Sequence, residues 1–181
     1  GALLEISNLV GSVMRLEDIL DRIVRVTAEL LEVPVCSIYL LKEDGSLVLR
    51  SCIGLEPSLK GNVAIPVEES LRWAVIRNNQ VVASPDATKD PRYRPLPSPL
   101  DSSCRAFLGA PLRIQDDVVG LMTVRRKEAA DFTPEQRKLL ETVCKQVAIV
   151  IEKAPSYEGK MQAEHQAAVA VSLTGLAHYI K

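Results

Sequence analysis

The stretch Ala106–Arg126, AFLGAPLRIQDDVVGLMTVRR, decides the fold of this chain. Two runs rich in apolar and β-branched residues, 106–114 and 118–126, flank Gln115-Asp116-Asp117, whose residue types suit a tight turn. The pattern predicts two long antiparallel strands that form a hairpin.

A long helix is predicted directly after this hairpin. Thr133 can cap it, Pro134 suits the first helical position, and Gln136 can complete a capping box. Apolar residues then recur at helical spacing and form one broad face: Leu139, Leu140, Val143, Cys144, Val147 and Ile151.

The N-terminal part of the chain predicts two more helices. Apolar residues recur at alternating spacings of four and three within residues 3–32: Leu9, Val13, Leu16, Leu20, Ile23, Thr27 and Leu30. We expect a break near Arg15–Glu17, where an entry helix gives way to the first domain helix. Pro34 ends that second helix, because the residue before a proline is disfavoured in helical geometry.

The middle of the chain predicts a second hairpin and several short elements. Two strands are predicted around the turn Glu43-Asp44-Gly45, at Val35–Lys42 and Ser46–Cys52. A short strand, a helix and another short strand are expected at residues 62–67, 68–79 and 80–83. This order of elements favours an α+β domain on an antiparallel sheet. Helices would cover one face of that sheet, and the other face could hold a pocket.

Residues 84–105 are the least regular segment. Their prolines argue against a regular helix or a central strand there: Pro85, Pro91, Pro95, Pro97 and Pro99. Because long loops in compact domains are often functional, we predict a partly ordered loop over a cavity.

The composition narrows the function classes. Apolar residues make up 47% and charged residues 25% of the 181 residues, which is typical of a globular core. The net charge of −1 provides no basic surface for a nucleic-acid backbone. The sequence has no run of 18 apolar residues, so no membrane span is predicted. The four cysteines lack CxxC spacing; we expect Cys36, Cys52 and Cys144 to be core residues and the location to be cytoplasmic.

Residues 17–152 resemble a GAF domain, the small-molecule sensor module of many signalling proteins. Six segments carry the resemblance, in the family's order: Leu16–Leu20, Cys36–Lys42, Gln80–Asp86, Lys89–Tyr93, Gly109–Leu112 with Val119–Met122, and Phe132–Glu135. The resemblance implies an antiparallel sheet of about six strands flanked by helices, with homodimers formed through long terminal helices. We therefore expect a dimerisation helix at 1–16, the sensor at 17–153 and a linker helix at 154–181.

The resemblance also allows known GAF cofactors to be considered in turn. Both histidines, His165 and His178, lie beyond the domain, which counts against a His-ligated haem. Cys104 has no neighbouring histidine, which counts against a bilin. Gln136 and Arg137 stand where members that bind cyclic nucleotides carry Asp-Glu after the phenylalanine. No metal ligands are predicted, and the ligand stays unidentified.

The candidate ligand-binding residues lie in the irregular loop and on the helix before it: Trp73, Ser84, Asp86, Tyr93, Asp101, Ser103, Cys104 and Arg105. We expect Trp73, the only tryptophan, near the pocket mouth. Asp and Ser in such loops also make local turn bonds, so both interpretations stay open. Arg105 could lower the pKa of the Cys104 thiol and favour peroxide sensing; a half-buried, unreactive thiol is the alternative.

The last residues, Ala177–Lys181, resemble the start of the phospho-acceptor box of bacterial histidine kinases. Val169, Leu173, Leu176 and Ile180 would be core positions of a coiled coil, which places His178 at an exposed position. We therefore expect the sensor of a histidine kinase that acts on a response regulator, with His178 as phospho-acceptor. A surface histidine in a module of a transcription regulator or cyclase is the alternative. A free methionine sulfoxide reductase is a weaker one, because the loop has a single cysteine.

Overall fold

A six-stranded antiparallel sheet forms the centre of the molecule, in a computed structural model that describes residues 15–61, 64–65 and 70–154. The strand order is β3-β2-β1-β6-β5-β4. The strands are β1 Val35–Leu41, β2 Leu47–Ile53, β3 Ala64–Ile65, β4 Val82–Ser84, β5 Ala106–Ile114 and β6 Asp117–Arg126.

The two predicted hairpins are confirmed and form the middle of the sheet. β5 and β6 pair from Ala106 opposite Arg126 to Ile114 opposite Asp117. β1 joins the hairpins because it pairs with β2 on one side and with β6 on the other. Gly120 allows this contact, since a Cβ atom there would lie 2.1 Å from the carbonyl oxygen of Tyr39.

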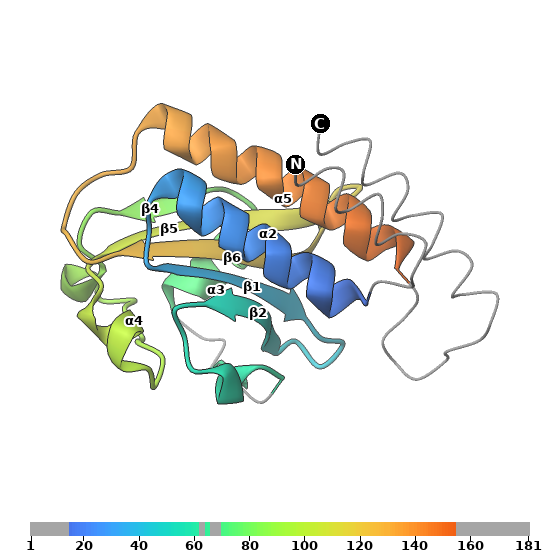
Figure 1. The fold of residues 1–181 in the computed structure, drawn as a ribbon, viewed down its shortest axis with the longest axis horizontal. Helices are drawn as coiled ribbons and strands as arrows, with labels where there is room; N and C mark the ends of the chain where they lie inside the picture. Colours follow the sequence, from blue (N-terminus) through green and yellow to red (C-terminus); the bar gives the residue numbers. More distant parts are fainter. Residues whose placement is uncertain (1–14, 62–63, 66–69, 155–181) are drawn as a thin grey trace.

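Two helices, α2 Leu16–Leu31 and α5 Pro134–Lys153, lie side by side on one face of the sheet (Figure 1). They run in opposite directions, so α2 begins at the end of the molecule where α5 ends. The predicted capping box is confirmed, because Thr133 and Gln136 exchange side-chain and backbone hydrogen bonds. Ile38, Leu108 and Met122 belong to the core beneath these helices.

Most of the predicted stripe on the first domain helix faces the core. Leu16, Leu20 and Thr27 are buried against the sheet, whereas Leu30 is 61% exposed. The helix ends at Leu31, before Pro34, and Glu32 adopts a left-handed conformation with a φ of 55°. The break expected near Arg15–Glu17 agrees with the start of α2 at Leu16.

The opposite face of the sheet, here called the loop face, is covered by α3 Leu71–Asn78, by α4 Pro99–Ser103 and by the segment between them. Ser70 caps α3 by accepting a hydrogen bond from the amide of Trp73. The helix packs closely because Gly109 has no side chain; a Cβ atom there would lie 2.8 Å from Val75 Cγ2. Tyr39, Phe107 and Leu121 belong to this second core.

The expectation that the prolines would exclude a regular helix from residues 84–105 is wrong. The segment contains the 3₁₀ turn η2 Ala87–Lys89 and the short helix α4. Pro99 takes the first position of α4, where a missing amide hydrogen costs nothing. A further 3₁₀ turn, η1 Pro57–Leu59, follows β2.

Several predictions fall on other parts of the chain. The entry helix, the linker helix, Val169, His165 and His178 lie outside the described residues, as does most of the strand expected at 62–67. Among the described helices, none is both long enough and apolar enough to cross a bilayer.

Candidate functional site

Three buried charged side chains meet on the loop face. Asp101 of α4 lies between Arg72 of α3 and Arg125 of β6, and the three residues are 0%, 3% and 2% exposed. We call Arg72, Asp101 and Arg125 the charged cluster. It connects the short helix of the loop to two elements that belong to the body of the domain.

Arg125 makes the closest contacts in the charged cluster. Its Nη1 donates to Asp101 Oδ1 at 2.9 Å, its Nη2 to the carbonyl oxygen of Cys104 at 2.8 Å, and its Nε to the carbonyl oxygen of Ala106 at 3.0 Å. Strand alternation places Arg125 on the loop face with Leu121, opposite Val35 and Phe107. A single side chain thus holds the loop carboxylate and the chain that leads into β5.

Arg72 approaches Asp101 from the helix side. Its Nη2 lies 3.5 Å from Asp101 Oδ1, its Nη1 donates to the carbonyl oxygen of Arg94, and its Nε donates to the Tyr39 hydroxyl at 3.2 Å. Burial lowers the pKa of Arg72, but Tyr39 and Asp101 raise it by more. The guanidinium therefore stays charged inside the protein.

The second carboxylate oxygen of Asp101 fixes the loop itself. Oδ2 accepts a hydrogen bond from the backbone amide of Leu96 at 3.0 Å. Buried charges are tolerated in proteins when they are paired and hydrogen-bonded, and each member of the charged cluster is. The arrangement holds residues 94–104 against the sheet through polar contacts.

Three of the eight predicted site residues meet at this cluster. Asp101 is its centre, the ring of Tyr93 lies 5.6 Å from the Arg125 guanidinium, and the Cys104 carbonyl oxygen accepts from Arg125. Cys104 takes part through its backbone rather than through its thiol.

Of the two interpretations of Cys104, the structure does not favour the reactive thiolate. The side chain is fully buried, and burial raises the pKa of the thiol, although Arg125 opposes the shift. Arg105, which the sequence suggested as the activating neighbour, pairs with Asp86 instead. The structure therefore supports the unreactive alternative.

Asp86 and Arg105 form a separate ion pair at the start of the loop. Asp86 also accepts from the backbone amide of Thr88 and so caps η2. The hydrogen bonds from Arg105 and Thr88 lower the pKa of Asp86 to about 2. The bond from Thr88 is the local turn contact of the second interpretation, whereas the pair with Arg105 spans 19 residues.

The three remaining candidates lie apart from the charged cluster. Trp73 is half-buried on α3 and packs against the loop-face core. Ser84 ends β4 opposite Phe107, and the hydroxyl of the exposed Ser103 donates to the carbonyl oxygen of Leu100.

Sequence reasoning missed Arg72, Arg125 and Tyr39. The signal for Arg125 was present, because period-two alternation from Leu121 through Thr123 places position 125 on the same face of its strand. Arg72 stands in an apolar helix, LRWAVI, where a charged side chain needs a partner. Nothing in the sequence links either arginine to Asp101, because the pairs span 29 and 24 residues.

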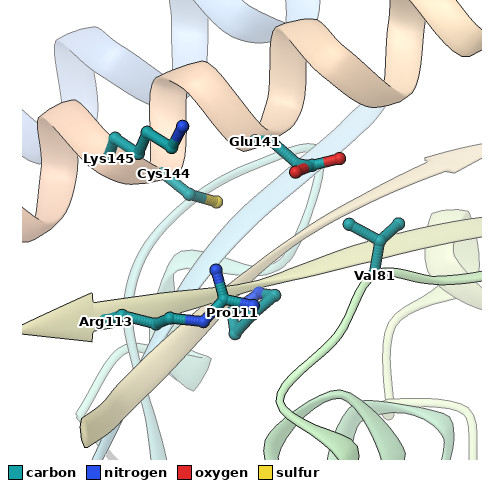
Figure 2. Close-up of a pocket in the computed structure, with 6 residues that line it drawn as sticks. All are labelled: Val81, Pro111, Arg113, Glu141, Cys144 and Lys145. Carbon is teal, nitrogen blue, oxygen red and sulfur yellow. The ribbon is translucent and has the colours of Figure 1, made fainter. Parts of the chain in front are cut away.

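A cavity of about 40 Å³ lies on the side of the sheet opposite the loop face, between β5 and α5 (Figure 2). It is lined by Val81, Pro111, Arg113, Glu141, Cys144 and Lys145. This volume suits a water molecule rather than a metabolite. Burial raises the pKa of Cys144, whose sulfur lies 3.7 Å from the carbonyl oxygen of Ala110.

Residues 15–61, 64–65 and 70–154 bring together no group of three or more His, Cys, Asp and Glu side chains able to hold a metal ion.

Two kinds of known protein that are similar to this chain are a phosphotransferase-system protein and a Nif-specific regulatory protein. A "Phosphoenolpyruvate-dependent phosphotransferase system" protein of Salmonella typhimurium is 28% identical over 151 residues, which are 83% of this chain and 20% of that protein. A Nif-specific regulatory protein of Azospirillum lipoferum is 23% identical over 125 residues, 67% of this chain and 20% of that protein. The chain thus spans about a fifth of the length of these curated relatives.

A solved structure agrees with the first of these relatives. The GAF domain of an Acinetobacter phosphoenolpyruvate-protein phosphotransferase is 31% identical, with a TM-score of 0.70; the match covers 83% of this chain and 90% of that one. The GAF domain family model matches residues 15–151, which include the sheet, both helical layers and the charged cluster. This chain therefore belongs to the GAF domain family.

Proposed function

We propose that the chain is the sensory domain of a longer, cytoplasmic regulatory protein, and that a small molecule bound on the loop face controls the output of that protein. The charged cluster carries this proposal. It holds the loop through exchangeable polar contacts, so a ligand that competes for them can release or reorder residues 94–104. A loop attached through apolar packing alone would offer no such competition.

A phosphotransferase of the phosphoenolpyruvate-dependent kind is the first candidate for the output. Its support is the similarity to such proteins in two comparisons, one of them at 31% identity. In the full-length protein, phosphoryl transfer from phosphoenolpyruvate would then depend on the state of the GAF loop.

A histidine kinase output is the second candidate, and the local sequence around His178 favours it. There, ATP would phosphorylate His178, and a response regulator would receive the phosphoryl group. A transcription regulator stays a third output, supported by the Nif-specific relatives. The methionine sulfoxide reductase alternative loses support, because Cys104 is buried.

Radiolabelled phosphate distinguishes the outputs. The full-length protein is incubated with labelled phosphoenolpyruvate or labelled ATP, and acid-labile protein phosphate is measured. Label from phosphoenolpyruvate that persists in His178→Gln supports the first candidate. Label from ATP that this substitution abolishes supports the second. If Arg125→Met leaves the output rate unchanged in a folded full-length protein, the sensory role of the loop face is refuted.

Homodimer formation is also part of the proposal. Val26 and Leu30 are large apolar residues of α2 that are 38% and 61% exposed, on the layer that α2 shares with α5. Burial of such residues against a second copy would be favourable. Light scattering should show a dimer that Leu30→Glu dissociates; an unchanged mass for this variant would contradict a dimer formed through α2.

A further inference from the structure

The carboxylate of Asp101 occupies a position with the chemistry of an oxyanion site. Two guanidinium groups converge on Asp101 Oδ1, at 2.9 Å from Arg125 and 3.5 Å from Arg72. Guanidinium groups bind carboxylates and phosphates through paired N–H donors. The donors come from α3 and β6, whereas the acceptor comes from the five-residue helix α4.

Charge within the cluster is unbalanced. Two arginines face one carboxylate, which leaves a formal excess of one positive charge inside the protein. Among the described residues, Asp101 is the carboxylate paired with either arginine. Backbone carbonyl oxygens and the Tyr39 hydroxyl accept the other hydrogen bonds from the two arginines. A buried excess charge is costly, so this position favours anions.

A second polar group nearby has no partner. The Ser37 hydroxyl is 0% exposed and has no hydrogen-bond partner among the described residues. Ser37 lies next to Tyr39 in strand alternation, directly opposite Thr123 and diagonal to Arg125 on β6. Diagonal neighbours on one face lie about 7–8 Å apart, a distance that a molecule of a few atoms can bridge. Unpaired buried hydroxyls are uncommon and indicate a missing partner.

We propose that the ligand of the loop face is a small oxyanion, a carboxylate or a phosphate, which takes the place of the Asp101 carboxylate between Arg72 and Arg125. The proposal rests on the sensory function proposed above. Asp101 is then the occupant of the site in the free protein. Ser37 supplies a further hydrogen bond to the part of the ligand that extends across β1.

The exchange provides a route from binding to loop movement. An entering oxyanion satisfies the same two guanidinium groups, so the charge inside the protein is not raised. Asp101 is released from both guanidinium groups, together with Leu96, whose backbone amide donates to Asp101 at 3.0 Å. Residues 96–101 thereby lose the carboxylate that attaches them to α3 and β6, which gives ligand-free and ligand-bound states different loop contacts.

Binding can be measured with the chain itself and with two simple oxyanions. Sodium acetate carries the functional group of the Asp side chain and tests carboxylates. Inorganic phosphate tests the second class of oxyanion. Sodium chloride at equal ionic strength is the control for salt effects. Trp73, adjacent to Arg72 and the only tryptophan, gives a fluorescence signal from α3. Thermal unfolding gives a second readout, because a ligand that binds the folded state raises the midpoint.

We expect a saturable change in Trp73 fluorescence with acetate or with phosphate, and none with chloride. Asp101→Asn should bind the same anion at least tenfold more tightly, because the internal carboxylate no longer competes. Arg72→Gln should abolish binding. Ser37→Ala removes no existing hydrogen bond, so it should fold normally and bind about threefold to tenfold more weakly.

Three results would overturn the proposal. One is the absence of a saturable change with either anion in both the natural chain and Asp101→Asn. Another is binding by Asp101→Asn alone, which would make the site a product of the substitution. The third is tighter anion binding by Asp101→Asn that persists when Arg72→Gln is added. If an uncharged metabolite instead alters the output of the full-length protein through this face, the sensory function stands and the oxyanion proposal fails.

Discussion

Replacement of Arg125 by methionine should destabilise the domain much more than the loss of an exposed charged pair of the loop. Methionine keeps an apolar stem of similar length but removes the hydrogen bonds to Asp101, Cys104 and Ala106, at 2.9, 2.8 and 3.0 Å. Removing one partner of a buried ion pair costs about 3–5 kcal/mol. Asp101 keeps Arg72 and the Leu96 amide, so we expect the lower end, a loss of about 3 kcal/mol in the free energy of unfolding.

Urea unfolding followed by circular dichroism and by Trp73 fluorescence measures this loss. Arg92→Met is the matched control, because Arg92 pairs with Asp90 on the same segment with 44% of its side chain exposed. Exposed pairs contribute about 0–1 kcal/mol. An Arg125→Met loss no larger than that of the control, at an unchanged denaturant slope, would refute the assignment of the charged cluster as the anchor of the loop.

Further predictions concern other parts of the structure. In the native protein, a disulfide reagent should label the half-buried Cys52 before the fully buried Cys104, as mass spectrometry of labelled peptides can show; early labelling of Cys104 would contradict its burial. Gly120→Ala should lower the free energy of unfolding by about 3 kcal/mol or more, because the new methyl group meets the Tyr39 carbonyl oxygen; an unchanged urea midpoint would show that the strands can separate locally. The pKa of Asp86 is held at about 2, below its ordinary value, so the stabilisation by its pair with Arg105 is complete above about pH 4 and is lost as the pH falls through 2. Asp86→Asn should remove this part of the pH dependence of the thermal midpoint, and an identical pH profile in the variant would contradict the pair.

Local chemistry made most of the fold predictable. The hairpin of β5 and β6 is specified by two apolar, β-branched runs around its turn, and the start of α5 by Thr133, Pro134 and Gln136. The boundaries that differ from the prediction belong to short elements, because tertiary contacts determine where those elements begin. Ser70 shortens α3 at its N-terminus, and Pro99 starts a helix where proline suggested only a break.

The candidate site was less predictable because its charges come from distant positions. Asp101 and Tyr93 were identified from the irregular loop, where polar residues and prolines concentrate. Arg72 and Arg125 lie in regular elements whose apolar neighbours suggested only core packing. Cys104 shows the opposite error: proximity in sequence suggested Arg105 as its partner, but the two side chains diverge at the start of β5.

The antiparallel course of α2 and α5 determines how the domain can be mechanically coupled to a host protein. The start of α2 and the end of α5 lie at the same end of the domain (Figure 1). In the proposed sensory role, a change on the loop face would therefore reach a host protein through the angle and offset between two adjacent helices, and not through the distance across the domain.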